Sequence, residues 1–368
     1  MTDLDRRAPA TGAPVPRTGG AQRPRRRLAL AGGLLGLLAL LVLAMSWAVT
    51  VGPASITVAQ VWGSVWHHVC SALAPGAVTC AADPLTTIQD AIVWQGRGAR
   101  VVAAASVGAG LAVAGTVMQA VVRNPLADPY LLGVSSGASL GAVAVLVVGM
   151  TVLLPVAAFV GAVGALVLTL LLAAGRGGGL PPVRTVLAGV AVGQACSALV
   201  SFVIFWSATG DSYREILSWL LGSFGGITWP ETMLALCGTV VLGGVLASRS
   251  RVLDAFAFGD VSASSLGVDV RRERWLLLVV VTLLTAVLVS VCGSIGFVGL
   301  VVPHAVRLVL GSRNHRVMPA AALVGALFLL LADTAARTVF EPRELPVGIL
   351  TAAIGAPVFA VLLRRSRL

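Results

Sequence analysis

The sequence predicts an all-α protein that crosses a membrane about ten times, with both ends of the chain in the cytoplasm. Apolar residues make up 57% of the 368 residues and charged residues only 11%, whereas soluble domains carry about 25% charged residues. The apolar residues fall into long runs, and the basic residues cluster at the ends of those runs. The 42 glycines also suit lipid-embedded helices, because glycine lets their backbones approach closely.

The chain begins with a segment, 1–27, that is rich in Pro, Gly and Arg. This composition predicts a disordered cytoplasmic tail. The apolar run that follows, 28–50, is long enough for a complete membrane span and too long for the apolar core of a signal peptide. We therefore expect a ten-helix domain over 28–368.

A more polar stretch, 51–95, predicts an extracytoplasmic loop. Nine further spans are expected after it, at 99–122, 131–148, 156–174, 185–206, 229–246, 275–292, 295–310, 318–340 and 347–363. The run at 295–310 is short for a crossing of about 20 residues. It is retained because without it the last three arginine clusters would lie outside the cell.

The basic residues support this topology. All 26 are arginine, and the ten-span arrangement places 21 of them on the cytoplasmic side, as the positive-inside rule requires. The five on the outer side are Arg97, Arg100, Arg214, Arg337 and Arg343. The net charge of +11 is thus accounted for by membrane topology, and we expect no nucleic-acid partner.

The residue types exclude several kinds of chemistry. Without lysine the chain cannot form a standard phosphate-binding Walker A loop, so any ATP and its magnesium must be bound by another subunit. The five cysteines form no CxxC pair, and a lone His304 at a helix end is a poor metal site because metal ligands come in clusters. We expect no enzyme activity, metal or cofactor in this chain.

Two interruptions divide the apolar sequence. Residues 124–129 read Asn-Pro-Leu-Ala-Asp-Pro, and the two prolines predict an extended or turning connection. The small residues that follow at 132–138 suit either close helix packing or irregular backbone beside a cavity. The glycines at 293, 296 and 299 lack the strand that a dinucleotide-binding fingerprint needs, and they predict a hinge between two membrane helices.

Asp333 and Arg337 stand four residues apart on one predicted span, so they share a helix face and can pair. An ionisable residue inside a span is a functional candidate by default. A proton-coupled secondary transporter could use such a pair, and this is the alternative to transport driven by ATP.

Two loops are also informative. The cytoplasmic loop 249–274 has apolar residues at helical spacing, which predict a short helix that either docks on a partner or lies on the lipid surface. Cys70 and Cys80 share the extracytoplasmic loop, where disulfides persist. Loop geometry decides whether these two cysteines pair.

In their order along the chain, these motifs resemble the FecCD-type permeases, which import iron–siderophores, haem and vitamin B12. The resemblance covers about 94–365 and includes N-P-L-A-D-P at 124–129, L-G-V-S-S-G-A at 132–138, G-F-V-G-L-V-V-P-H at 296–304 and E-L-P-V-G at 344–348. Two departures stand out: Gly98-Ala99 replaces Leu-Pro between two arginines, and Pro181-Pro182-Val183 replaces small polar residues.

The resemblance implies the type II fold of an ATP-binding-cassette (ABC) importer permease in the bacterial inner membrane. A second permease protomer, identical or different, two ATPase subunits and an extracytoplasmic binding protein would complete it, and a ferric siderophore is the favoured cargo, with haem and corrinoids as alternatives. The resemblance assigns binding-protein docking to Arg97, Arg100 and Arg337. It assigns the gate to Asn124, Pro125, Leu126, Ser135, Ser136, Pro182 and Val183, and ATPase docking to Leu253, Phe258, Gly259, Ala263, Leu266 and Gly267.

Overall fold

The computed structural model describes residues 22–52, 56–74, 85–175, 178–207, 210–340 and 343–365, and the regular structure in these ranges is entirely helical. Within them, seven helical segments are long and apolar enough to cross a membrane: Leu28–Thr50, Thr87–Val122, Thr151–Ala173, Pro182–Ser207, Trp229–Ser248, Val270–Cys292 and Asn314–Thr338. Three shorter apolar helices, α5 (Val134–Val148), α13 (Val298–Leu310) and α15 (Val347–Arg365), occupy the remaining predicted spans. The all-α fold and its set of apolar helices are confirmed.

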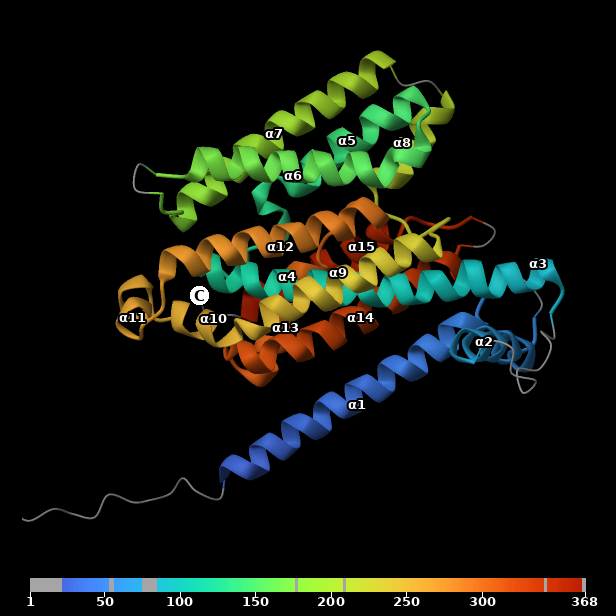
Figure 1. Ribbon diagram of the computed structural model, residues 1–368, viewed down its shortest axis with the longest axis horizontal. Helices are drawn as coiled ribbons and strands as arrows, with labels where there is room; N and C mark the ends of the chain where they lie inside the picture. The colour runs from blue at the N-terminus through green and yellow to red at the C-terminus, as the bar shows by residue number, and fades with distance from the viewer. Residues whose placement is uncertain are drawn as a thin grey trace, which may run out of the picture.

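Helix α4 (Ala99–Val122) forms the centre of the bundle. It packs against α9 (Trp229–Ser248), α12 (Val270–Cys292), α13 and α14 (Asn314–Thr338). Figure 1 shows α4 in the middle of the molecule, with α1 (Gln22–Thr50) along one side and α7 (Pro182–Ser207) on the opposite side. The apolar part of the α4 span is 89% buried and that of α1 only 11%, so α1 leaves most of its surface to lipid.

Glycines set the distance between α4 and two of its neighbours. Gly108 faces Gly325 of α14, and Gly115 faces Gly299 of α13. A methyl group added to Gly115 would collide with the Gly299 carbonyl. Because lipid supplies no hydrophobic drive between helices, such close van der Waals packing holds membrane bundles together.

The predicted hinge lies between α12 and α13, where residues 293–297 are not helical. Gly293 and Phe297 both have positive φ, at 72° and 69°, and together they reverse the chain direction. The Ser294 hydroxyl lies 2.6 Å from that of Ser135 at the start of α5, and the Tyr130 hydroxyl donates to the Ile295 carbonyl at 2.9 Å. Non-helical backbone is tolerated within the membrane where other protein groups make hydrogen bonds to its N–H and C=O groups.

The predicted span at 295–310 is only partly helical. Helix α13 has 13 residues, or about 20 Å of helix at 1.5 Å per residue, against a hydrocarbon core about 30 Å thick. Its Gly299 meets α4 at Gly115, well inside the bundle. Helix α13 alone is therefore too short to cross the membrane.

The segment predicted as a loop, 51–95, contains helical structure in two places. Helix α2 (Val58–Leu73) begins at a capping box in which the Thr57 hydroxyl accepts from the Gln60 amide and the Gln60 side chain accepts from the Thr57 amide. The second span starts earlier than predicted, at α3 (Thr87–Asp90), and continues through a π-helix, η1 (Ala91–Gly98), into α4. These helical elements correct the prediction that the whole of 51–95 is a loop.

The N-terminal boundary also differs from the prediction. Helix α1 begins at Gln22, so residues 22–27 of the predicted disordered tail are helical. Residues 1–21 lie outside the described residues. Cys70 is disulfide-bonded, while Cys80, which shares its predicted loop, falls outside the described ranges.

We expect Gly115→Val to destabilise the protein by about 1–3 kcal/mol, because the added side chain must separate α4 from α13. The midpoint of thermal unfolding in detergent measures this. Gly164→Val is the matched control, since Gly164 lies in α6 (Leu154–Ala173) with no atom within 4 Å of an added Cβ. Equal losses in the two variants would show that the close contact does not set stability.

Candidate docking and pathway sites

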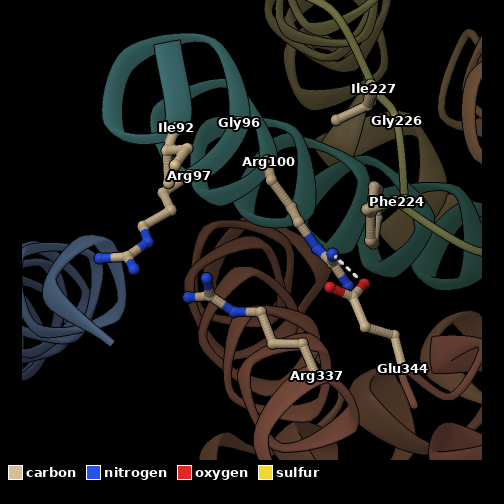
Figure 2. A pocket seen from close by; sticks show the side chains of 10 residues that line it. Ile92, Gly96, Arg97, Arg100, Phe224, Gly226, Ile227, Arg337 and Glu344 are labelled. Carbon is tan, nitrogen blue, oxygen red and sulfur yellow. Dashed lines mark hydrogen bonds and ion pairs between the residues drawn. The ribbon is translucent and has the colours of Figure 1, made fainter. Parts of the chain in front are cut away.

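Three arginines of the outer side come together in one recess. Arg97 lies on η1, Arg100 on α4 and Arg337 on α14. Together with Phe224, Glu344 and neighbouring residues they line a cavity of about 400 Å³. In Figure 2 the guanidinium groups of Arg97 and Arg337 face each other, while the Arg100 side chain extends the other way, toward Glu344. We call this cavity the outer recess.

Arg100 is held by two carboxylates. Its Nε and Nη2 donate to Asp333 of α14 at 2.8–3.1 Å, and its Nη1 donates to Glu344 at 2.6 Å. The Asp333 side chain is 2% exposed and that of Glu344 54%. The guanidinium therefore joins a fully buried carboxylate to one that reaches the surface. Its planar fork suits this bidentate geometry.

Arg97 and Arg337 donate to the end of α1. Arg97 Nη1 lies 3.5 Å from the Val49 carbonyl and 3.4 Å from that of Thr50, and Arg337 Nη2 donates to the Ala48 carbonyl. The last carbonyls of a helix lack intrahelical partners and carry partial negative charge. The C-terminus of α1 thus offers partial negative charge to both guanidinium groups.

One donor in the recess stays without a partner. The Arg337 Nε is buried and makes no hydrogen bond within the described part of the chain. Three guanidinium groups here meet the two carboxylates Asp333 and Glu344, so the described side chains leave an excess of positive charge. A recess of this kind suits an anionic group from outside.

The outer recess corrects one expectation. The three arginines assigned to binding-protein docking are only 5–8% exposed, because η1, α4 and α14 close around them. Asp333 was expected to pair with Arg337, yet its ion pair is with Arg100, 233 positions away in the sequence. Glu344 belongs to the motif E-L-P-V-G at 344–348. It lies far from Arg100 in the sequence, so spacing along the chain could not predict that the two residues pair.

The cytoplasmic loop forms two short helices, α10 (Ser250–Phe256) and α11 (Asp260–Ser265), rather than the single helix expected. The predicted docking residues divide between two environments. Leu253 and Ala263 are fully buried, whereas Phe258 and Leu266 are 74% and 69% exposed. Gly259 and Gly267 have positive φ and shape the turns after each helix. Val261, which the sequence analysis did not single out, joins the exposed apolar group.

Polar contacts fix α10 to the bundle. Asp254 accepts from the Asn314 amide at 2.6 Å and contacts the His315 ring at 3.2 Å. Arg307 of α13 donates to the Asn314 side chain at 2.9 Å and to the Thr116 carbonyl at 3.1 Å. The cytoplasmic loop is therefore connected to α13 and to α4.

Helix α11 is fixed in the same way. Asp260 pairs with Arg274 of α12 at 2.8 Å and with Arg123 at 3.4 Å. The hydrogen bond from Arg274 holds the pKa of Asp260 below its usual range. Asp260 thus stays charged at neutral pH and joins α11 to the ends of α12 and α4.

The predicted gate residues lie in three separate places. Asn124 and Pro125 line a cytoplasmic cavity of about 260 Å³ with Leu253 and Arg307, and Leu126 is exposed nearby. Ser135 and Ser136 lie at the start of α5, beside the hinge. Pro182 begins α7, where Val183 is exposed. Their assignment to a gate remains a prediction.

A polar stripe on α7 was missed by the sequence analysis. Gln194, Ser197 and Ser201 are exposed at i, i+3 and i+7 spacing on an otherwise apolar helix. The Ser197 hydroxyl donates to that of Ser136 at 3.2 Å. Polar groups in membrane helices usually face protein or a water-filled cavity, so this spacing could have indicated a pathway surface.

We expect Asp333→Leu to destabilise the protein by about 3–5 kcal/mol, because it removes the buried partner of Arg100 Nε and Nη2 and leaves the guanidinium only the half-exposed Glu344. The double variant Arg100→Met/Asp333→Leu should recover most of that loss. A double-mutant cycle on thermal unfolding in detergent measures both effects.

The matched control is Arg123→Met, because Arg123 is 41% exposed and its partner Asp260 keeps Arg274. This substitution should lower the free energy of unfolding by no more than about 1 kcal/mol. A stable Asp333→Leu variant would show that the Arg100 pair does not support the fold.

Comparison with known proteins places the chain in a family. The model of the FecCD transport family matches residues 38–365. The vitamin B12 import system permease protein BtuC of Salmonella typhimurium is 42% identical over 296 residues, which cover 80% of this chain and 88% of that protein. The Salmonella typhi protein of the same name matches with the same identity and coverage.

Solved structures agree with this placement. An ABC transporter assigned to the metal-chelate type, in an inward-facing conformation, matches with a TM-score of 0.78 and 30% identity over 91% of this chain and 100% of its own. PsaBC from Streptococcus pneumoniae, in complex with Fab, shares the fold alone, with a TM-score of 0.54 and 16% identity over 73% of this chain and 91% of its own. The chain belongs to the FecCD transport family and is a multi-pass permease subunit of an ABC importer of the bacterial inner membrane.

Proposed function

We propose that this chain forms, with a second permease protomer, the pathway for a metal held in an organic chelate and delivered by an extracytoplasmic binding protein. The outer recess is the observation that carries the proposal. Its buried guanidinium groups, with one unpartnered Nε at Arg337, suit a carboxylate presented by a docking protein. Charge-assisted hydrogen bonds to a preformed guanidinium are among the strong polar contacts.

The chemical class of the cargo rests on the relatives. The family resemblance favours a ferric siderophore, with haem and corrinoids as alternatives. The relatives that are 42% identical are named as vitamin B12 permeases, and the neighbour that is 30% identical is assigned to metal chelates. All these cargoes are metal chelates, so the class is proposed, with a corrinoid and a ferric siderophore as its two candidates.

The cytoplasmic face supports docking of the ATPase subunits, which would bind ATP and magnesium. Phe258, Val261 and Leu266 expose apolar side chains there, although the loop around them is polar. Their backbone is held to the bundle through Asp254 and Asp260. A rigidly held apolar surface suits the transmission of movement between subunits.

The proposed second protomer is supported by α7. Its polar stripe of Gln194, Ser197 and Ser201 is exposed in this single chain, and lipid would be a poor neighbour for these groups. A second protomer placed against this face would enclose a polar pathway. The start of α5, with Ser135 and Ser136, adjoins the same face.

The alternative of a proton-coupled secondary transporter relied on an Asp333–Arg337 pair. Asp333 is instead bound bidentately by Arg100, and protonating it would break a buried ion pair. No observation favours this alternative.

In proteoliposomes that contain the permease, its ATPase and its binding protein, we expect uptake of a metal chelate only when ATP is present. Uptake of labelled cobalamin and of labelled ferric siderophores should be compared, and the binding protein should hold the transported one. A Walker A Lys→Ala variant of the ATPase is the control. Uptake driven by a proton gradient without ATP would contradict the proposal.

A second test concerns the outer recess. Arg97→Gln and Arg337→Gln should each weaken docking of the binding protein by about 2–5 kcal/mol, as expected when one partner of a desolvated charge pair is lost. Basal ATP hydrolysis should remain. Arg214→Gln is the matched control, because Arg214 is exposed on the outer helix α8 (Gly210–Leu220). Unchanged docking affinity at low salt in both recess variants would place docking elsewhere.

A further inference from the structure

Helix α2 carries an apolar stripe that the described residues leave uncovered. Its members are exposed and follow one another at spacings of four, four, three and four residues: Val58, Trp62, Trp66, Val69 and Leu73. At 3.6 residues per turn these positions share one side of a helix. Trp66 is 60% exposed and Leu73 81%.

The opposite side of α2 is fixed to the bundle. Val61 and Ser64 are fully buried. The Ser64 hydroxyl donates to Asp90 at 2.6 Å, and the His68 ring nitrogen contacts both oxygens of Asp90 at 3.0 Å. The His68 ring also stacks on Trp94 of η1, with centroids 4.3 Å apart. These contacts fix the rotation of α2 about its own axis. The apolar stripe therefore faces outward because the other side of the helix is bound to the bundle.

The position of α2 is that of a helix at a membrane surface. In Figure 1, α2 is seen nearly end-on beside the end of α1, while the long apolar helices run across the view. Trp94 packs against Trp229, with centroids 4.9 Å apart, at the first residue of α9. Helix α2 therefore lies across the spans, level with the outer end of α9.

The composition of α2 also fits this position. The helix contains no Lys, Arg, Asp or Glu, so its exposed stripe offers no charge to a protein partner. Tryptophan is enriched at membrane–water interfaces, where its amphipathic ring sits at the level of the head groups. Helix α2 contacts α1, whose own surface exposes Leu43 and Trp47. The stripe thus continues the lipid-facing surface of α1 around its outer end.

We propose that α2 is an interfacial helix whose Trp62 and Trp66 insert into the outer leaflet, at the boundary between head groups and acyl chains. An amphipathic helix binds there by burying its apolar face in the plane of the membrane. Because Asp90 and Trp94 join α2 to η1, this contact also anchors the π-helix that carries Arg97. The partner is the lipid surface itself, rather than a second protein.

Fluorescence quenching in proteoliposomes tests the proposal on the full-length protein. The chain has eight tryptophans, so the emission lost in Trp62→Phe/Trp66→Phe isolates the contribution of these two. We expect that contribution to be blue-shifted, to lose most of its intensity in lipids brominated near the top of the acyl chain, and to resist aqueous acrylamide. If the double variant is poorly produced, the emission lost in each single variant is measured instead, and the same result is expected for each tryptophan.

The matched control is Ser71→Trp on the double-variant background, because Ser71 is exposed but lies away from the stripe. Its emission should respond to acrylamide and not to brominated lipid. If Trp62 and Trp66 respond to acrylamide like the control, the lipid assignment is overturned. It is equally overturned if they become protected only when the binding protein or a second protomer is added, since the stripe would then be a protein interface.

Discussion

The outer half of this bundle depends on a buried ion pair between its central helix and α14. Arg100 and Asp333 contact each other through two guanidinium nitrogens, with the aspartate side chain 2% exposed. A pair in such surroundings recovers its desolvation cost only when its geometry is good and its remaining donors are satisfied. Here Glu344 takes the remaining nitrogen. The pair therefore fixes α4 against α14 above the glycine contacts that hold the two helices together lower down.

A second consequence concerns the neighbours of that pair. With Asp333 and Glu344 occupied by Arg100, Arg97 and Arg337 depend on carbonyls at the end of α1. Helix α1 is otherwise the most loosely attached of the long spans, with only 11% of its apolar part buried. The two arginines thus hold a lipid-exposed helix to the core through backbone groups that the helix itself cannot use.

Much of the architecture could be predicted from the sequence, because lipid imposes a simple rule on spanning segments. Long apolar runs and arginine placement identified the spans, and three closely spaced glycines identified the hinge after α12. The pairing of Asp333 was wrong because spacing on one helix identifies local partners, whereas Arg100 approaches from another helix. Helix α2 was missed because a 16-residue helix lying on a membrane surface need not be apolar all round. The capping residues Thr57 and Gln60, with the Trp62–Trp66 repeat, were the signals that could have found it.

The π-helix η1 has a consequence for how this segment tolerates changes in length. A π-helix closes its hydrogen bonds over five residues instead of four, so it accommodates more residues per turn than the α-helix that follows. Residues 91–98 therefore contain extra chain length between two fixed points, Asp90 with its hydrogen bonds to α2 and Arg100 in its ion pair. A one-residue deletion beside Ile92 could be absorbed by conversion to an α-helical turn, with α4 left in register. The same deletion within α4 would rotate Gly108 and Gly115 away from their contacts. Homologous chains should accordingly vary in length at η1 and keep a constant length from Arg100 to Gly115.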